Sequence, residues 1–360
     1  MNSTLKTGII GGGLGPHLNE AMANQVFLLS KNIGAQVITT NDLGLWPFKR
    51  YFEGRYLILN SKFLMRKTPL LSQLNGFLIF IAIKYFEHKF DQLIIPGGIN
   101  SIFLTYLNNA KCVPIITSLP TLTENDRVAI KQQLSKVLEI IVQSKKTKKQ
   151  LLEIGVDEKK IQILLPLVDY SRFHYAPPNE SDIFTILFAS APTIEIPNED
   201  NFSDKGIPIL LEAFKNLSKN PDFKCKLILI WRNTYYQRLQ ECLKNLQLTE
   251  NVEIVNSVVD MESYYHRSDV TIIPYTTLHR SPEIPLSALE SIACGRPVIT
   301  TNVGEISDIV KENTWGVVSK PDAVSLYVAM IDSKEKYYVY QRNCFYSKNP
   351  LTDLNFLEIQ

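Results

Sequence analysis

Short apolar runs alternate with amphipathic stretches of helical length along most of the chain. This alternation is typical of a parallel sheet whose strands are joined by crossover helices. In the first half of the chain, the apolar runs predict strands at residues 7–10, 35–39, 92–95, 113–117 and 139–143. Helical spacing predicts helices at residues 19–31 and 145–154, and Gly155 closes the second one in the usual position after a helix.

A second alternating series begins after residues 176–179, where the sequence Ala-Pro-Pro-Asn is typical of a linker. Its predicted strands are residues 185–189, 226–231, 252–255, 270–274, 297–300 and 316–318, and its predicted helices are residues 207–217, 235–246 and 286–293. The pattern therefore predicts an α/β protein with two doubly wound domains, residues 1–170 and 171–335. The aromatic segment 336–360 is predicted to be irregular and to cross back to the N-terminal domain.

Composition and charge narrow the classes of function. A chain of 360 residues, 45% of them hydrophobic and 21% charged, has the composition of a soluble globular protein with two cores. The net charge of +2 gives no indication of a nucleic-acid partner. The five cysteines are scattered, which favours reduced thiols in a cytoplasmic protein over a disulfide framework or a zinc site. We expect neither a signal peptide nor a membrane span.

The most informative chemistry falls in residues 280–295. Pro285 suits the first turn of a helix and Gly295 suits its end. The backbone N–H groups of residues 286–288 would then point outward and form an anion site suited to a diphosphate. One turn further in, the Glu290 carboxylate can accept hydrogen bonds from both hydroxyls of a ribose. The alternative is a solvated helix residue, but the apolar neighbours of Glu290 favour the binding role.

A family resemblance covers most of the chain from about residue 140 to residue 322. The runs at residues 285–299 and 303–310 resemble family 4 of the glycosyltransferases, the glycosyl transferases group 1. Blocks at residues 142–156, 163–173, 205–214 and 264–270 agree with that family in order and spacing. The resemblance implies the GT-B fold, in which two Rossmann-like domains face each other across a cleft, with the nucleotide-sugar site on the C-terminal domain.

The resemblance also implies roles for individual residues. Glu290 would bind the donor ribose, Lys205 the diphosphate, and the backbone around Val258 the base. Leu286 and Ser287, at the predicted helix start, belong to the same donor site. A cation directly before a helix start, as Lys205 is, also makes physical sense beside a phosphate.

Two features of the C-terminal half depart from the family's pattern. The family carries an E-x(7)-E motif, but the position eight residues before Glu290 is Pro282, and Glu283 stands one place late. Either the loop is one residue shorter and Glu283 serves as the catalytic carboxylate, or that carboxylate is absent. The family's arginine after the first strand of this domain is also missing. Arg232, at the end of the next strand, either takes its place in the donor site or pairs with an acidic neighbour.

The N-terminal domain opens with a strand that runs into a glycine loop. The loop fails the dinucleotide spacing G-x-G-x-x-G, because Pro16 stands where the third glycine would be. It resembles the glycine-rich loop of GT-B enzymes, which implies donor contacts from Gly12 and Gly13. His17 is then a candidate catalytic residue that contacts acceptor or sugar. Asn19 has the same candidate role, or caps the following helix.

Residues 45–84 combine basic and aromatic side chains. The basic ones are Lys49, Arg50, Arg55, Lys62, Arg66, Lys67 and Lys84, against the single acid Glu53. Such a surface suits peripheral contact with the inner face of a membrane, and the acceptor would then be lipid-linked. The alternative is an ordinary solvated face over core aromatics.

The resemblance implies a retaining glycosyltransferase that moves a hexose from a nucleotide-diphosphate sugar to a hydroxyl acceptor, either a glycan or a lipid-linked group. No Asp-x-Asp motif occurs in the sequence, so we expect no metal requirement and no cofactor besides the donor substrate. One alternative is a catalytically weakened paralogue that binds nucleotide sugars in a regulatory or scaffolding role. Another GT-B reaction, such as phosphorolysis or epimerisation of the sugar, is the second alternative.

Overall fold

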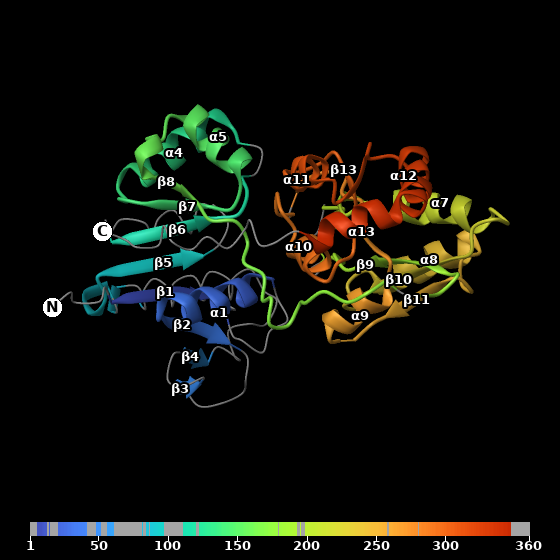
Figure 1. Cartoon of the computed structure of the whole chain (residues 1–360). Coiled ribbons are helices and arrows are strands. Elements are labelled where there is room, and N and C mark those ends of the chain that lie inside the picture. Colours follow the sequence, from blue (N-terminus) through green and yellow to red (C-terminus); the bar gives the residue numbers. More distant parts are fainter. Residues whose placement is uncertain are drawn as a thin grey trace. The chain divides into compact units, whose positions relative to one another are not determined.

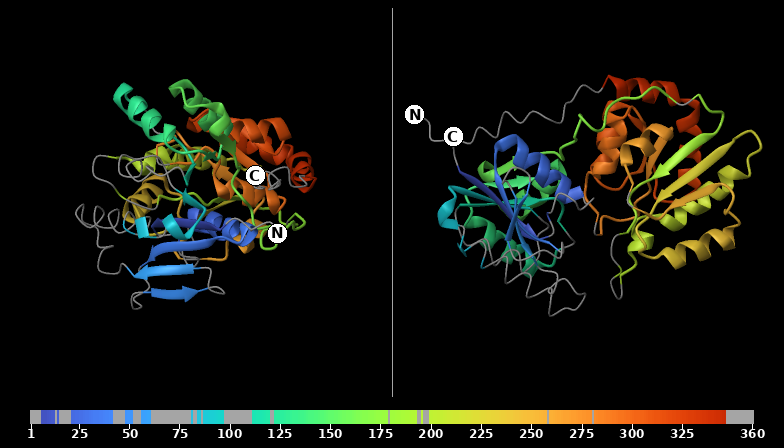
Figure 2. Two further views of the ribbon diagram at one scale, coloured as in Figure 1. Left: turned by 90° about the vertical axis from the view of Figure 1, so that its left-hand side faces the viewer. Right: turned by 90° about the horizontal axis from the view of Figure 1, so that it is seen from below.

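The computed structural model describes residues 6–12, 14, 21–41, 48–51, 56–60, 81, 84–85, 87–96, 111–119, 122–178, 180–192, 195, 199–257, 259–279 and 281–346. These residues form two compact units (Figure 1). Among the described residues, unit 1 ends at Leu167 and unit 2 begins at Val168. Each unit consists of a sheet with helices packed on it (Figure 2).

Unit 1 contains a sheet with the strand order β3-β4-β2-β1-β5-β6-β7-β8. Its strands are β1 (Thr7–Gly12), β2 (Gln36–Asn41), β3 (Phe48–Tyr51), β4 (Tyr56–Asn60), β5 (Gln92–Pro96), β6 (Cys112–Ile116), β7 (Ile140–Val142) and β8 (Ile161–Ile163). Neighbouring strands are parallel except that β3 is antiparallel to β4. The strands predicted in this half are all present, whereas β3, β4 and β8 were not predicted.

Both faces of the unit 1 sheet are covered, because consecutive strand residues point to opposite sides. In β1, Ile9 packs with α1 (Ala21–Ile33), and Ile10 packs with α4 (Glu124–Ser135) and α5 (Lys145–Ile154). The helix predicted at residues 145–154 has the bounds of α5. Ser144 caps its N-terminal end by accepting the N–H of Thr147, and Gly155 ends it in the left-handed conformation.

Unit 2 contains a wholly parallel sheet with the strand order β11-β10-β9-β12-β13-β14. Its strands are β9 (Phe184–Phe188), β10 (Cys225–Ile230), β11 (Val252–Val255), β12 (Val270–Ile273), β13 (Val298–Thr301) and β14 (Gly316–Ser319). Its helices are α6 (Asn201–Asp204), α7 (Ile207–Ser218), α8 (Tyr236–Leu246), α9 (Met261–Arg267), α10 (Leu286–Ala293), α11 (Ile306–Asn313), α12 (Ala323–Glu335) and α13 (Tyr337–Phe345). This strand order is that of the Rossmann fold, so the predicted class of two doubly wound domains is confirmed.

The main core of unit 2 lies on one face of its sheet. Strand residues such as Ile186 and Leu229 pack there with apolar side chains of α7, α8 and α12. On the strands, Leu187 and Ile273 point to the other face and are buried as well. The helices α9, α10 and α11 contact β9, β12 and β13. The strand order reverses between β9 and β12, which defines the switch point of the sheet.

The segment after Lys334 corrects one expectation. Residues 337–345 form α13, which contacts α10, α12 and β14 of unit 2. Tyr337, Tyr340, Gln341 and Cys344 are its buried residues, and their spacing is that of one helix face. The prediction of an irregular segment is therefore wrong for these residues, whereas the prediction that the tail crosses back to the first domain stays a prediction. The rest of the predicted tail lies outside the described residues. No helix that the structure describes is long and apolar enough to cross a membrane.

Candidate functional site

The candidate site lies at the switch point of unit 2, where β9 and β12 pair. Sheets of this kind bind ligands beyond the carboxyl ends of their strands, at the point where the strand order reverses. Three segments leave or meet this edge of the sheet. They are the connection from β9 to α7, the loop after β12, and the N-terminal end of α10.

Lys205 is a buried cation at this edge. It ends α6, and only 8% of the residue is exposed. Its Nζ donates a hydrogen bond of 3.3 Å to the hydroxyl of Tyr275 and lies 4.4 Å from the centre of the Tyr275 ring. No carboxylate among the described residues forms an ion pair with Lys205. A buried lysine is ordinarily paired with an acid, whereas the described partner of this one is a tyrosine hydroxyl.

Gly206 explains why a glycine follows that lysine. Its φ of 73° is left-handed, and a Cβ built on it would lie 1.6 Å from the carbonyl oxygen of Pro274, just after β12. The Gly206 carbonyl in turn accepts the N–H of Leu210 in the first turn of α7. The missing side chain therefore lets the backbone at Gly206, directly after Lys205, pack against the residue that follows β12.

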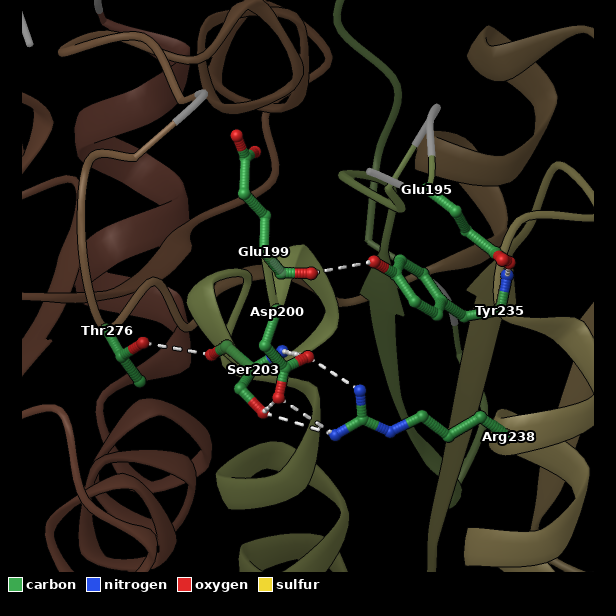
Figure 3. Close-up of polar contacts among 7 residues, drawn as sticks. All are labelled: Glu195, Glu199, Asp200, Ser203, Tyr235, Arg238 and Thr276. Atoms are coloured by element: carbon green, nitrogen blue, oxygen red, sulfur yellow. Dashed lines mark hydrogen bonds and ion pairs between the residues drawn. The ribbon is translucent and has the colours of Figure 1, made fainter. Parts of the chain in front are cut away.

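Polar contacts attach α6 to its neighbours (Figure 3). Asp200 caps α6 by accepting the N–H of Ser203, and the Arg238 guanidinium on α8 donates to both Asp200 carboxylate oxygens, at 2.6 and 3.0 Å. This pairing lowers the pKa of Asp200 to about 2. On the other side, the Thr276 hydroxyl donates to the Ser203 carbonyl at 2.9 Å. The contacts of Asp200 and Ser203 therefore hold α6 in place, and with it Lys205 at the C-terminal end of this helix.

The loop that precedes α6 is attached to α8 as well (Figure 3). The backbone N–H of Tyr235 donates to the Glu195 carboxylate at 2.5 Å, and the Tyr235 hydroxyl donates to the Glu199 carbonyl at 3.3 Å. The Arg238 guanidinium also stacks 4.3 Å from the centre of the Phe202 ring. These contacts fix the path of the chain from β9 to Lys205.

The start of α10 partly fits the predicted anion site. Pro285 precedes it, and no side chain caps it. The Ser287 hydroxyl lies 2.9 Å from that of Ser190, which follows β9, so two hydroxyls meet at the helix start. The expectation of three outward N–H groups is corrected, because the N–H of Ala288 donates to the Pro285 carbonyl at 3.1 Å. That tight first turn leaves Leu286 and Ser287 to supply the N–H donors.

Glu290 is buried rather than solvated, with 7% of the residue exposed. Its Oε2 accepts a hydrogen bond of 2.9 Å from the hydroxyl of Tyr265, on α9. Burial raises the pKa of Glu290 to about 7, and the hydrogen bond from Tyr265 opposes that rise. The same burial, with the nearby carboxylate, raises the pKa of Tyr265 well above its usual value. The protein therefore holds Oε2, and Oε1 has no hydrogen-bond partner among the described residues.

Glu283 takes part in the architecture of the loop. It is buried, and its Oε2 accepts the N–H of Glu305 at 2.8 Å. Its backbone carbonyl accepts the N–H of Ile306 at 3.0 Å, so Glu283 contacts the N-terminal end of α11 with main chain and side chain. A carboxylate is stabilised there by the helix dipole. A catalytic role for Glu283 stays a prediction.

Arg296, for which the sequence motifs predicted no role, is completely buried. Its guanidinium donates to four backbone carbonyls, those of Ala176, Pro177, Tyr265 and His266. The last two belong to the final turn of α9, where a cation is favourable. Arg296 therefore fastens α9, which carries the Glu290 partner Tyr265, to the first residues of unit 2.

The remaining residues that the sequence predicted for the site are either placed elsewhere in the two units or lie outside the described residues. Arg232 is exposed at the end of β10. The backbone of Gly12 ends β1, at the carboxyl edge of the unit 1 sheet. Gly13, His17 and Val258 lie outside the described residues, as does most of the predicted basic surface at residues 45–84.

Part of unit 2 is similar in sequence to known glycosyltransferases. Residues 199–333 match the family model of the Glycosyl transferases group 1, a segment that contains Lys205, Glu283 and Glu290. Over 118 residues the chain is 27% identical to an uncharacterized glycosyltransferase of Methanocaldococcus jannaschii. That match spans 32% of this chain and 30% of the relative, under a third of either protein.

Solved structures resemble the chain over nearly its whole length. A glycosyltransferase from Rickettsia africae has a TM-score of 0.69 at 17% identity, covering 95% of this chain and 93% of the other. The sucrose-phosphate synthase of Thermosynechococcus elongatus has a TM-score of 0.73 at 15% identity, with coverage of 95% and 92%. Anabaena HepE, solved with UDP-glucose, has a TM-score of 0.70 at 14% identity, with coverage of 95% and 93%. These likenesses confirm the GT-B fold, and with the family match they support a glycosyltransferase.

Proposed function

We propose that this protein is a retaining glycosyltransferase that moves a hexose from a nucleotide-diphosphate sugar to a hydroxyl acceptor. The observation that carries the proposal is the buried Lys205 ammonium, which has a tyrosine hydroxyl as its partner and forms no ion pair with the described carboxylates. A buried charge without a counter-ion is costly unless a ligand supplies one. The diphosphate of a nucleotide sugar is such a ligand.

The neighbouring groups suit the same anion. The N-terminal end of α10 has no side-chain cap, and its dipole favours negative charge at that point. The hydroxyls of Ser190 and Ser287 can each turn a hydrogen toward a phosphate oxygen, because both are rotatable donors. Lys205, the helix end and these hydroxyls would together stabilise the charge that develops on the leaving diphosphate.

Glu290 suits the ribose of the donor. A ribose diol offers two O–H donors, and a carboxylate accepts both on one edge. The Tyr265 hydroxyl already occupies Oε2 and sets the direction of the group. Burial raises the pKa of Glu290 to about 7, so that near neutral pH the carboxyl is only partly ionised. Hydrogen bonds from the two ribose hydroxyls would favour its ionised form.

On this proposal, unit 2 holds the donor, and the acceptor hydroxyl attacks the sugar on the face that the diphosphate leaves. The protein mainly orients the reactants and stabilises charge, and the Lys205 and α10 contacts do this without a metal ion. We further propose a glycan or lipid-linked acceptor, supported by the basic and aromatic composition of residues 45–84.

The first test is a donor screen with UDP-, GDP- and ADP-sugars, in which binding is followed by calorimetry and chemistry by release of free nucleoside diphosphate. The proposal expects nucleotide release that depends on an acceptor, with the anomeric configuration of the donor kept in the product. Binding without nucleotide release would instead support a nucleotide-sugar-binding role. Product formation that requires inorganic phosphate would indicate phosphorolysis.

The second test removes the buried ammonium group of Lys205. Lys205→Met should weaken donor binding at least about tenfold, because a charge-assisted contact is lost. It should leave the unfolding temperature equal or higher, because the variant no longer buries an uncompensated charge. Lys219→Met, at the exposed C-terminal end of α7, is the matched control and should change neither quantity. Unchanged donor affinity in Lys205→Met would contradict the proposal.

A further inference from the structure

Two histidines and a glutamate meet on the surface of unit 2, next to the Arg296 contacts described above. They are His174, in the segment that opens the unit, and Glu262 and His266, both on α9. Glu262 and His266 are four residues apart, so they share one face of the helix. One ligand atom from each of the three residues lies within 4.8 Å of the other two.

The contacts within this trio orient the rings. The Nδ1 of His174 lies 2.7 Å from the Oε1 of Glu262, and the two imidazole rings are 5.3 Å apart between centres. The Nε2 of His266 lies 2.9 Å from the backbone carbonyl oxygen of His174. A carbonyl acceptor on one ring nitrogen of a histidine fixes its tautomer, and metal-binding histidines are commonly held in this way.

The chemistry of the trio matches a transition-metal ion. With both imidazoles neutral, the three residues carry one negative charge, and two nitrogen ligands with one carboxylate form the set that Zn²⁺ accepts. Ligand atoms around tetrahedral Zn²⁺ are separated by a little over 3 Å, given bonds of about 2.0–2.1 Å. The His174 and Glu262 side chains are partly exposed, so a small opening of their contact costs little.

We propose that His174, Glu262 and His266 form a binding site for a divalent transition-metal ion, with Zn²⁺ as the fitting ion. His174 Nδ1 faces both Glu262 Oε1 and the Arg172 carbonyl oxygen, which lies 3.2 Å away. When the ion binds Nδ1, the ring proton moves to Nε2 of the same imidazole, which therefore stays neutral. A water completes the fourth position. The residues joined are 88 apart in sequence at the least, so the ion staples the opening segment of unit 2 to α9.

The proposed ion would lie next to contacts that already hold α9 in unit 2. Arg296 already ties Ala176 and Pro177 to the last turn of α9, which contains His266. Tyr265, the residue before His266, holds Glu290. An ion at the trio therefore reinforces the same junction from the outside and stabilises the folded unit, since ligands that bind only the folded state raise its stability.

The test uses the full-length chain, stripped of metal with a chelator and then titrated with ZnCl2. Calorimetry should show one site in the wild type that is lost or weakened at least about tenfold in His174→Gln and in His266→Gln. Saturating Zn²⁺ should raise the unfolding temperature of the wild type by about 5 °C, and that of the two variants by far less. His174 has a 62% exposed side chain, so His174→Gln should fold as the wild type does.

His279→Gln is the matched control. His279 also contacts a glutamate, with its Nε2 3.1 Å from Glu199, but it is not part of a metal-ligand trio among the described residues. It should keep the Zn²⁺ site. Co²⁺ then distinguishes the ligands, because thiolate ligation gives intense near-ultraviolet absorption and imidazole with carboxylate does not. Equal Zn²⁺ binding in all variants, thiolate absorption, or no binding by the wild type would each overturn the proposal.

Discussion

The hydroxyl of Tyr265 on α9 donates a 2.9 Å hydrogen bond to Oε2 of Glu290 on α10, and both residues are buried. The bond joins helices that are 25 residues apart in sequence at these positions. It opposes the effect of burial on Glu290 and so keeps the pKa of that carboxyl near 7. Tyr265 thereby controls both the direction and the ionisation of the carboxylate proposed to hold a ribose.

We expect Tyr265→Phe to move the pH dependence of nucleotide binding. Removing the hydroxyl takes away a hydrogen bond that lowers the pKa of Glu290, so its carboxyl will stay protonated to higher pH. Donor affinity at pH 7 should fall severalfold and should recover as the pH is raised toward 9. Calorimetry with UDP between pH 6 and pH 9 measures this shift.

Tyr264→Phe is the control for that experiment. It removes a hydroxyl from the adjacent tyrosine, whose ring contacts Arg267. Its pH profile should match the wild type. Titration of the Glu290 carboxyl by carbon NMR follows the same effect without any nucleotide, so a failure of UDP to bind does not obscure it. An unchanged Glu290 pKa in Tyr265→Phe would show that the hydrogen bond has no electrostatic role.

Glu290→Gln should separate stability from function. Burial raises the pKa of Glu290 from 4.5 to about 7, so the folded protein holds this proton at a pH where the unfolded chain has released it. Stability from this group is therefore lost as pH rises from about 4.5 to about 7, a loss on the order of 3 kcal/mol. The variant should be more stable than the wild type at pH 8, with the difference shrinking toward pH 5. Urea unfolding at the two pH values measures it.

The same carboxylate should be needed for turnover. Glu290→Ala is expected to reduce sugar transfer at least about tenfold while circular dichroism shows an intact fold, since two hydrogen bonds to the donor would be lost. Wild-type turnover in this variant would remove Glu290 from the donor site, whatever its effect on stability.

Gly206→Ala should destabilise unit 2 strongly. The new Cβ would overlap the Pro274 carbonyl, and the left-handed φ of 73° would also be strained. We expect a loss of about 3 kcal/mol or more in the free energy of unfolding, together with weaker donor binding. Gly34→Ala isolates the strain, because Gly34 has a φ of 68° and open space around it. It should cost only about 1 kcal/mol. Similar losses in the two variants would mean that the loop after β12 can move aside.

Arg238→Gln should affect binding more than stability. Its pair with Asp200 is partly exposed, and such pairs contribute at most about 1 kcal/mol. The pair nevertheless anchors the helix that carries Lys205, so donor affinity should fall severalfold. Lys336→Gln removes a comparable exposed pair, with Asp332, and should leave donor affinity unchanged. Thermal unfolding and UDP calorimetry on both variants distinguish positioning from general stabilisation.

Local signals explain which parts of the fold could be predicted. The bounds of α5 and α10 follow from caps and punctuation near each end, and the parallel strands follow from their continuous apolar runs. The sequence pattern failed for α13, whose aromatic residues have weak helix propensity and whose helix is stabilised by packing on α10 and α12. Strand β8 was not predicted because it is short and the apolar residues continue beyond its end, so no turn residue marks its limit.

Residues of the candidate site could be predicted where they stand at a helix boundary that the local sequence marks. Residues that only tertiary packing brings to the site could not be predicted. Lys205, Ser287 and Glu290 stand at a helix boundary or on the helix that begins there. Tyr265 and Ser190 reach the site only through the pairing of β9 with β12 and the packing of α9 on α10. The loss of the Ala288 N–H to Pro285 depends on backbone geometry that residue types do not reveal.

The Arg296 contacts have a consequence for how unit 2 responds to its surroundings. The positive charge of the guanidinium is stabilised by hydrogen bonds to four peptide carbonyls, none of which gains or loses a proton in the ordinary pH range. Dissolved ions cannot reach a completely buried group, so salt does not screen these bonds. The junction between the opening segment and α9 should therefore persist across a wide range of acidity and ionic strength, even where the surface ion pairs around it dissociate.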